Sequence, residues 1–390
     1  MTFESRPTVE VLKLLDQHLL NHFAFPAAEL VREHPPRWFC KNKRLVYDLS
    51  CPYGADSFHG TLQYTRWKEF SLPKKIPVGQ SIDLIVECVD DVFQYGPPEM
   101  ENTVSWHLNF ADANLFGYYG GRLFAQDESQ CLEHPALCSL VESLSRVRVA
   151  SPTLTTITNS QGVTLATPIL IRGVERRAQV KTNRNEEEGR PAGLYGNQFA
   201  IAKPESVTKA TTVFDQRLDA RGRPYYSNII AMEAPKYGNG KYTIYTIRRI
   251  LATAYTGFLA AKFESMVELG LLSRNHDPKA DSATTIPDDS DTKSPPIIEI
   301  HTGNWGCGAY GGNIAIMSLL QITAARLAGV NKLVYHAAGK ANQRQFNEGL
   351  KTYNKLVLEK GNNGEGELDL DVFVHEVEKH HFQWGFSNGT

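Results

Sequence analysis

A glycine-rich hexapeptide, GCGAYG from Gly306 to Gly311, has the residue types and spacing of a phosphate-binding loop. The run PIIEIH before it is β-branched, and the run NIAIMSLLQITAARLAGV after it has the apolar spacing of a helix. Such a loop can direct several backbone N–H groups at an anion beside a helix N-terminus, where the helix dipole adds to the attraction. The pattern predicts a phosphate ligand, although a tight turn without a ligand would use the same glycines.

A nicotinamide dinucleotide is the least favoured ligand of this loop. Its binding domain needs an acidic residue about 20 residues beyond the glycines to bind the ribose hydroxyls. No Asp or Glu occurs between Asn313 and Asn347, and the next apolar run, KLVYHAAG, ends in alanines. The residues that follow are also too few for the remaining strands of a doubly wound domain. The sequence therefore favours a phosphate ligand of another kind.

A second stretch, residues 109–137, carries two adjacent carboxylates. Asp127 and Glu128 follow Gly120 and Gly121 in a segment that is suited to begin a helix. Side chains of adjacent residues on a helix point about 100° apart, so one carboxylate can reach a scissile bond while the other binds a hydroxyl group. A solvated acidic first turn, which the helix dipole favours, is the alternative.

Apolar periodicity places both stretches in an α/β protein. The strand-like runs are SIDLIVECVDDVF, VSWHLNFAD and ATPILIRGV. Helical spacing is found in CLEHPALCSLVESL and in the long run YTIYTIRRILATAYTGFLAAKFESMVEL, which we expect to pack against the sheet. The charged and then glycine-rich run VKTNRNEEEGRPAGLYGNQFA predicts a long surface loop, a type of segment that often carries function.

Three regions are expected along the chain. Residues 1–80 begin with the helical run TVEVLKLLDQHLLNHF and are predicted to form an N-terminal helical accessory region. Residues 81–345 hold the strand-like runs and are predicted to form the α/β domain. Within it, residues 274–296 are poor in apolar side chains and rich in Asp, Ser, Thr and Pro, which predicts a mobile insertion. Residues 346–390 are predicted to form a C-terminal helical extension.

The composition restricts which binding partners and which cellular compartment we expect. The 390 residues carry a formal net charge of −2, which calls for neither nucleic acid nor an anionic membrane as partner. No apolar run is long enough to cross a bilayer, and MTFESRPTVEVLKLL does not have the pattern of a signal peptide. The six cysteines form no C-x-x-C pair, so we expect a reducing compartment, the cytoplasm or nucleus.

No metal site is expected from the twelve histidines. The segment HEVEKHH, from His375 to His381, departs from the zinc motif H-E-x-x-H because Lys379 stands at the position of the second ligand. We interpret it as a charged, exposed helical face.

Three segments together resemble the poly(ADP-ribose) glycohydrolases, whose catalytic domain is a macrodomain. TGNWGCGAYGG is similar to the diphosphate-binding loop of that family, with Trp305 and Cys307 at positions that a generic phosphate loop does not require. QDESQCLEHPAL resembles the family's catalytic signature, and AMEAP followed by TIRRILATAYTGFLAA resembles a third segment. The resemblance spans about residues 100–340, in the family's order. It implies a three-layer α/β/α fold with a central mixed sheet, here with N-terminal accessory helices.

The resemblance also implies a set of site residues. Glu128 falls on the catalytic glutamate, and Asp127 falls on its neighbour, which holds ribose. Asn114 matches a ribose-binding asparagine, with a register placing Asp112 there as the alternative. The implied substrate-binding residues are Asn114, Gly120, Gly121, Gln126, Tyr195, Asn304, Gly306, Cys307, Gly308, Ala309, Tyr310 and Gly311.

The implied activity is metal-independent and cofactor-independent hydrolysis of the glycosidic bond at the terminal ribose of ADP-ribose, which would release ADP-ribose from poly- or mono-ADP-ribosylated protein. Two departures concern substrate choice: only residues 122–125 separate the glycines from the acidic signature, a shorter spacer than in the family, and Asp127 replaces a glutamate. Two alternatives stay open. One is a mono-ADP-ribosyl-arginine hydrolase acting as a bacterial effector in the host cytosol, and the other is a module that binds ADP-ribose without cleaving it.

Overall fold

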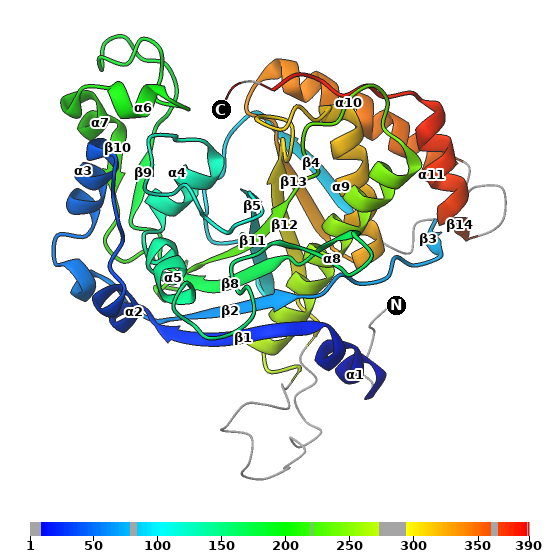
Figure 1. Ribbon diagram of the computed structural model, residues 1–390, viewed down its shortest axis with the longest axis horizontal. Coiled ribbons are helices and arrows are strands. Elements are labelled where there is room, and N and C mark those ends of the chain that lie inside the picture. The colour runs from blue at the N-terminus through cyan, green and yellow to red at the C-terminus, as the bar shows by residue number, and fades with distance from the viewer. Residues whose placement is uncertain are drawn as a thin grey trace.

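The apolar runs of the chain pair into one eight-stranded mixed sheet (Figure 1). The computed structural model describes residues 9–78, 84–219, 221–272, 294–359, 366–387 and 389. In spatial order the strands are β1 (Leu19–Pro26), β2 (Thr61–Trp67), β8 (Ile169–Val174), β11 (Ser227–Glu233), β5 (Thr103–Ala111), β12 (Ile297–Gly303), β13 (Lys332–His336) and β4 (Ile85–Val89).

The sheet has a parallel half and an antiparallel half. β11, β5, β12, β13 and β4 run parallel to one another. β1, β2 and β8 pair antiparallel, and β8 joins the parallel half through an antiparallel pairing with β11. The predicted α/β fold with a central mixed sheet is therefore confirmed, and the parallel half brings the carboxyl ends of neighbouring strands to one edge.

Helices cover both faces of this sheet. On β5, the Trp106 indole donates a hydrogen bond to Ser265 of α8, whereas the Asn109 amide donates one to Asp127 of α4. Because side chains alternate along a strand, residues 106 and 109 point to opposite faces, so α8 and α4 lie on opposite faces. Six of the helices are α4 (Gln126–Glu133), α5 (Ala136–Leu144), α8 (Ile244–Glu268), α9 (Ile314–Ala328), α10 (Lys340–Tyr353) and α11 (Leu370–Lys379).

Further strands and helical segments complete the described part of the chain. Three strand pairs lie outside the main sheet: β3 (Lys75–Pro77) with β14 (Glu367–Asp369), β6 (Thr156–Thr158) with β7 (Thr164–Ala166), and β9 (Ala178–Val180) with β10 (Thr211–Val213). The remaining helical segments are α1 (Val9–His18), α2 (Ala27–Glu33), α3 (Lys41–Ser50), η1 (Gly54–Ser57), α6 (Gln198–Ile201), α7 (Pro204–Ala210) and η2 (Asn354–Glu359).

The N-terminal region, predicted as a helical accessory region, also contains two strands of the main sheet. The helical periodicity holds only to His18, where α1 ends, and the next eight residues form β1. β1 pairs with β2 along its length, and the ring of Phe23 stacks on that of Tyr64 at a centroid distance of 5.6 Å. Pairing and ring packing thus outweigh the local helical pattern. The domain boundaries themselves stay predictions, and most of the expected insertion at 274–296 lies outside the described residues.

A second, smaller core lies beside the sheet, under α3, α6 and α7. Phe124 and Phe199 stack there with ring centroids 4.0 Å apart. The backbones of Phe124 and Gly196 exchange two hydrogen bonds, of 3.1 and 2.9 Å. This exchange fixes the predicted surface loop next to the segment that leads into α4.

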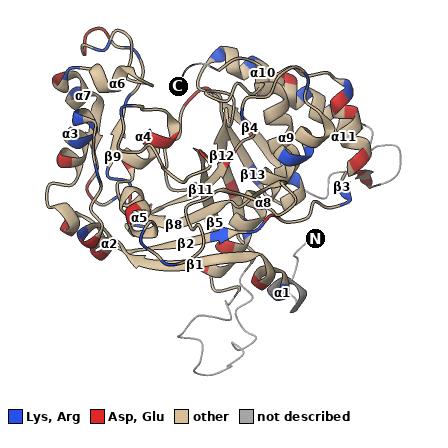
Figure 2. Cartoon of the chain, viewed as in Figure 1, with Lys and Arg blue, Asp and Glu red and all other residues tan. Residues whose placement is uncertain are grey.

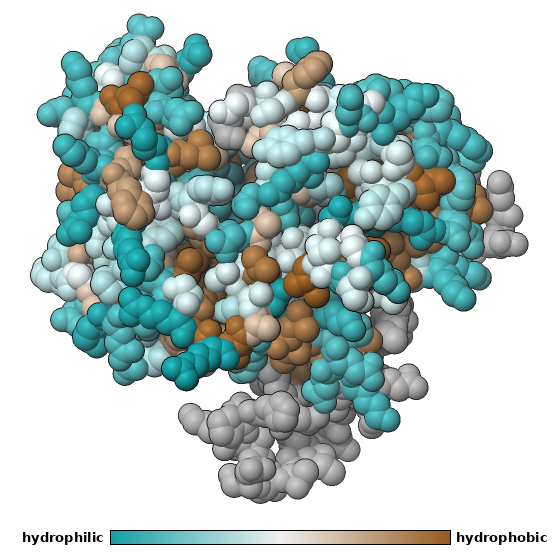
Figure 3. Space-filling model, in the orientation of Figure 1, coloured by the Kyte–Doolittle hydropathy of each residue, from teal (hydrophilic) through white to brown (hydrophobic). Residues whose placement is uncertain are grey.

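One face of the molecule can be followed in the space-filling view. In Figure 3 the face in view is largely hydrophilic, with hydrophobic residues in small, separate groups. None of the helices in the described ranges is both long and apolar enough to cross a membrane.

Candidate active site

A cavity of about 310 Å³ opens at the carboxyl ends of the three central parallel strands. β5 ends at Ala111, β11 at Glu233 and β12 at Gly303, and the residues that follow each strand line the cavity. This is the edge at which α/β sheets commonly bind ligands. The lining residues are Phe110, Ala111, Asp112, Tyr118, Leu123, Ala125, Gln126, Asp127, Glu128, Tyr195, Ala234, Tyr237, Asn304, Trp305, Gly306, Gly308, Ala309 and Tyr310.

The N-terminus of α4 is docked on β5 by a side-chain amide. Gln126 donates from Nε2 to the carbonyl of Leu108 at 3.0 Å and accepts the N–H of Phe110 at 2.8 Å. Because both ends of this amide are engaged, Gln126 positions the helix even though it also lines the cavity. Glu128 closes the first turn by accepting the N–H of Ala125 at 3.0 Å, so the acidic end of α4 is fixed against the sheet (Figure 2).

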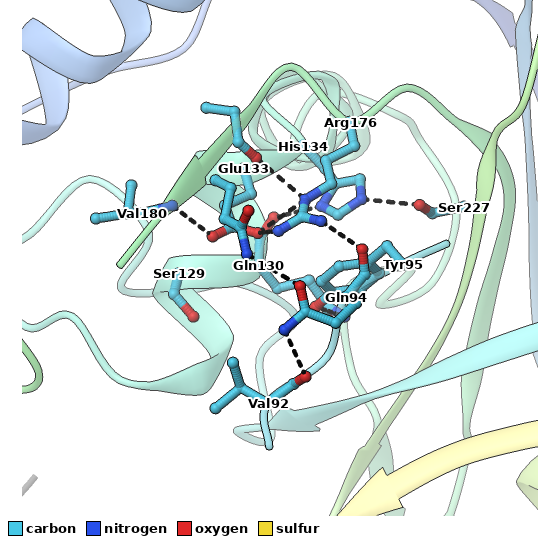
Figure 4. A network of polar contacts seen from close by, with 12 residues as sticks. Val92, Gln94, Tyr95, Ser129, Gln130, Glu133, His134, Arg176, Val180 and Ser227 are labelled. Atoms are coloured by element: carbon cyan, nitrogen blue, oxygen red, sulfur yellow. Dashed lines mark hydrogen bonds and ion pairs between the residues drawn. The ribbon is translucent and has the colours of Figure 1, made fainter. Parts of the chain in front are cut away.

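The other end of α4 is held by a buried polar network (Figure 4). Glu133 forms an ion pair with Arg176, with 2.6 Å between Oε2 and the guanidinium, and accepts the N–H of Val180 at 2.9 Å. His134 forms a hydrogen bond with Ser227 at 3.0 Å, and Gln130 donates to the Tyr95 hydroxyl at 3.0 Å. A helix held at both ends presents its carboxylates in a constant orientation.

Asp127 is the more deeply engaged of the two carboxylates. Its Oδ1 accepts a hydrogen bond from Asn109 on β5 at 2.9 Å, and its side chain is nearly excluded from solvent. Burial raises the pKa of Asp127 well above its ordinary value, and the adjacent charge of Glu128 raises it further, against the effect of the Asn109 bond. A buried acid pair of this kind resists losing both protons.

Glu128 is also buried, with 3% of its surface exposed. Burial raises the pKa of this carboxyl above its ordinary value, while the positive charge of Lys43 and the N–H groups of the first turn act in the opposite direction. A carboxyl that is protonated near neutral pH can donate a proton to a leaving group and then act as a base. The pair therefore has the properties of a general acid and a neighbouring polar anchor.

The glycine loop is built on contacts that only glycine allows. Gly306 has a φ of +74°, and a Cβ there would lie 2.5 Å from the Cβ of Ala234. Trp305 is fully buried and donates from its indole to the carbonyl of Met232 at 3.0 Å. Asn304 is held at both ends, donating to the Ala337 carbonyl and accepting from a tyrosine hydroxyl. The loop is therefore rigid before any ligand enters.

The C-terminal segment braces the same loop. The N–H of Gly385 donates to the carbonyl of Gly311 at 2.8 Å, and the Asn313 side chain donates to the carbonyl of Gln383 at 3.1 Å. Asn313 also caps α9 by accepting the N–H of Ala315 at 2.9 Å. The end of the loop and the start of the helix are thus fixed together.

A polar cluster lies between the glycine loop and β5. The hydroxyl of Tyr310 donates to Asp112 at 2.9 Å, and Lys236 forms ion pairs with Asp112 at 2.8 Å and with Glu233 at 2.7 Å. Although burial acts against it, the bonds from Lys236 and Tyr310 lower the pKa of Asp112 below its ordinary value. Asp112 is therefore ionised near neutral pH. The two carboxyls on α4 differ from it, because their pKa values are raised.

Most of the sequence-predicted site residues line this one cavity: Gln126, Asp127, Glu128, Tyr195, Asn304, Gly306, Gly308, Ala309 and Tyr310. Asn114, Gly120, Gly121, Cys307 and Gly311 do not.

The residues outside the lining have other neighbours. Asn114 is exposed and bridges to Leu154, so of the two proposed registers only Asp112 lies at the cavity. Gly120 packs against residues 37–40, where a Cβ would lie 2.2 Å from the carbonyl oxygen of Arg37. The close packing of these two backbone segments therefore leaves room only for glycine at position 120. The Cys307 thiol donates to the Trp305 carbonyl.

Sequence reasoning missed two polar groups near the acid pair. Asn109 stands out only as a polar residue inside the strand-like run VSWHLNFAD. Lys43 lies in the basic run KNKR, which is typical of an exposed helical turn, yet its side chain is fully buried. No group of three His, Cys, Asp or Glu residues in the described ranges is arranged to hold a metal ion.

The mixed sheet and the cavity at its carboxyl edge define an α/β macrodomain with an acidic helix N-terminus in its ligand site. Residues 192–345 match the family model described as "Poly (ADP-ribose) glycohydrolase (PARG), Macro domain fold". The matched segment is about two fifths of the chain and holds the glycine loop, whereas Asp127 and Glu128 lie before it.

A curated relative, "Probable poly(ADP-ribose) glycohydrolase 2" of Arabidopsis thaliana, is 27% identical over 170 residues. The matched segment covers 40% of this chain and only 30% of that protein. Among solved structures, poly(ADP-ribose) glycohydrolase from Thermomonospora curvata is 14% identical, with a TM-score of 0.38 over 87% of this chain and 95% of that chain. The Deinococcus radiodurans enzyme in complex with ADP-ribose is 12% identical, with a TM-score of 0.38 over 90% of this chain and 99% of that chain.

Proposed function

We propose that this protein is an ADP-ribosyl glycohydrolase, which binds ADP-ribose in the cavity and hydrolyses the glycosidic bond at its terminal ribose. The observation that carries the proposal is the buried pair Asp127 and Glu128, held at a helix N-terminus in the same cavity as a rigid glycine loop. The match of residues 192–345 to the glycohydrolase family model supports it. A module that only binds ADP-ribose has no use for a protonated carboxyl.

The ligand is bound from two sides in this proposal. Backbone N–H groups between Gly306 and Gly311 bind the diphosphate, as expected of a glycine loop that leads into a helix. Tyr310 and Tyr195 cover the sugars, since both line the cavity. Asp127 and Asp112 accept hydrogen bonds from the ribose hydroxyls.

Glu128 performs the chemistry. Burial raises the pKa of this carboxyl, which favours the protonated form, and in that form it donates a proton to the departing atom as the bond from the anomeric carbon breaks. The ribose passes through an oxocarbenium-like state. The carboxylate of Glu128 then takes a proton from the attacking water and returns to its starting form, so no other reactant is consumed.

The test compares Glu128→Gln with wild type. We expect release of ADP-ribose from poly- and mono-ADP-ribosylated proteins to fall by about 10²- to 10⁴-fold, because a general acid contributes about that much. Affinity for ADP-ribose, measured by calorimetry, should stay within a few-fold of wild type. The matched control is Glu205→Gln, which changes an exposed glutamate in the first turn of α7 and should leave the rate unchanged.

The same assay separates the alternatives. Equal and slow release by wild type and Glu128→Gln, with ADP-ribose still bound, would reduce the protein to a binding module. Release from mono-ADP-ribosyl-arginine alone would favour the arginine-linked substrate, for which the short spacer at residues 122–125 leaves room.

A further inference from the structure

Lys43 is a buried cation that the proposed mechanism does not use. It lies on α3, outside the segment that matches the family model, and its residue is fully excluded from solvent. Its Nζ donates to the carbonyl oxygen of Tyr119 at 2.7 Å. No carboxylate of the described ranges forms a direct ion pair with it. A buried ammonium without an ion pair is costly unless opposite charge lies nearby.

The opposite charge comes from the acid pair on α4. Lys43 interacts electrostatically with both Glu128 and Asp127, and in each case it favours the ionised carboxylate. The helices α3 and α4 pack against each other, and Tyr119, whose carbonyl accepts from the ammonium, lies in the segment that leads into α4. Burial lowers the pKa of Lys43, and the negative charge of Glu128 acts in the opposite direction.

The other groups around these three side chains are weak acids or lie on the cavity side. Lys43 faces the thiols of Cys40, Cys131 and Cys138. Burial raises the pKa of the Cys131 thiol well above its ordinary value, so it stays neutral.

On the cavity side, Asp112 acts on both carboxyls of the pair, and Tyr195 faces Glu128. Asp112 forms its ion pair with Lys236, which also pairs with Glu233, so Lys236 is engaged outside the acid pair. Within the described ranges, Lys43 is therefore the cation whose positive charge acts on both carboxyls of the acid pair.

Charge neutrality then fixes the protonation of the cluster. In a medium of low polarity, one ammonium supports one carboxylate, because a second negative charge would lie unpaired beside the first. We propose that Lys43 is a positioning residue whose buried ammonium holds the Asp127 and Glu128 pair in a state with one proton and one negative charge. This rests on the proposed function, because that state is the one in which one carboxyl can donate a proton while its neighbour accepts hydrogen bonds from the ribose.

The first test needs no change at Lys43 and no hydrolase activity. Carboxyl carbons of Asp127 and Glu128 in the labelled full chain are followed by NMR as pH is varied, with Asp127→Asn and Glu128→Gln serving to assign the signals. We expect the pair to carry one proton at pH values above the ordinary carboxyl range and below the raised pKa of Asp127. Two protons, as with a neutral lysine, or none would overturn the proposal.

The second test removes the charge. Lys43→Met is compared with Lys43→Arg, which keeps it, and with Lys41→Met, which changes an exposed lysine on the same helix. Without the ammonium, we expect the titration of the acid pair to move upward by about one pH unit or more. If Glu128 hydrolyses the substrate, the basic limb of the rate profile moves with it, while Lys43→Arg and Lys41→Met keep the wild-type profile.

The outcomes separate this inference from the proposed function. A protein without hydrolase activity that still shows one shared proton, shifted upward in Lys43→Met, would retain the role of Lys43 and lose the proposed reaction. A slower Lys43→Met enzyme whose carboxyl titration matches wild type would show that Lys43 only tethers the Tyr119 carbonyl, and would overturn the inference. If Lys43→Met does not fold, the proton count in wild type decides.

Discussion

At the residue scale, the acid pair depends on side chains from elements far apart in sequence. Asp127 and Glu128 could be predicted because they are adjacent and lie in a recognisable motif. Asn109 and Lys43 could not, because their importance comes from β5 and α3 packing on α4, which no local pattern encodes. The alternative placement at Asp112 needed the structure for the same reason. Sequence motifs thus locate the residues that line the cavity better than they locate the residues that hold those side chains in place.

The bond between Asn109 and Asp127 gives a residue-scale prediction. Asn109→Ala removes the donor to a buried carboxyl, so we expect the free energy of unfolding to fall by about 1–3 kcal/mol. Urea denaturation measures this at neutral pH. In a double-mutant cycle with Asp127→Asn, the coupling free energy should be about 0.5 kcal/mol or more. Additive effects would show that the 2.9 Å contact contributes nothing.

At the element scale, the strand, glycine loop and helix around residues 297–328 follow the predicted order, because each has a strong local signal. The same reasoning was wrong for β1. Its residues continue a helical pattern, and only the partner strand β2, over forty residues later in the chain, decides the outcome. Local patterns therefore predict elements with strong boundaries and miss those set by pairing.

The glycine loop gives an element-scale prediction with a matched control. Gly306→Ala places a Cβ at a φ of +74° and 2.5 Å from the Ala234 Cβ, whereas Gly240→Ala places one at +67° in open space. The strain that both share costs about 1–2 kcal/mol. We expect Gly306→Ala to lose more unfolding free energy than Gly240→Ala and to weaken ADP-ribose binding at least tenfold by calorimetry. Equal losses, with full affinity, would refute the close-approach argument.

At the scale of the whole molecule, segments far from the cavity in sequence support the site. Residues 37–43 hydrogen-bond to the loop before α4, and the segment that ends at Gly385 braces the glycine loop. Neither contact was anticipated from sequence, where both regions were assigned to accessory helices. Both supporting segments lie outside residues 192–345, the part of the chain that matches the family model.

The buried acid pair gives a prediction about stability and pH. Since the pKa of Asp127 is raised in the folded protein, the folded state binds more protons than the unfolded state above the ordinary carboxyl range. Unfolding free energy therefore falls as pH rises from about 4 through the raised pKa, by about 1.4 kcal/mol for each unit of the shift. Asp127→Asn cannot titrate, so its stability should fall less over this window. Parallel curves for variant and wild type would contradict the assigned shift.

The most direct test of the account is a crystal structure of Glu128→Gln with ADP-ribose bound. The account predicts the diphosphate within hydrogen-bond distance of backbone N–H groups between Gly306 and Gly311, and the anomeric carbon of the terminal ribose beside position 128. ADP-ribose bound elsewhere, or bound with its terminal ribose turned away from α4, would contradict it.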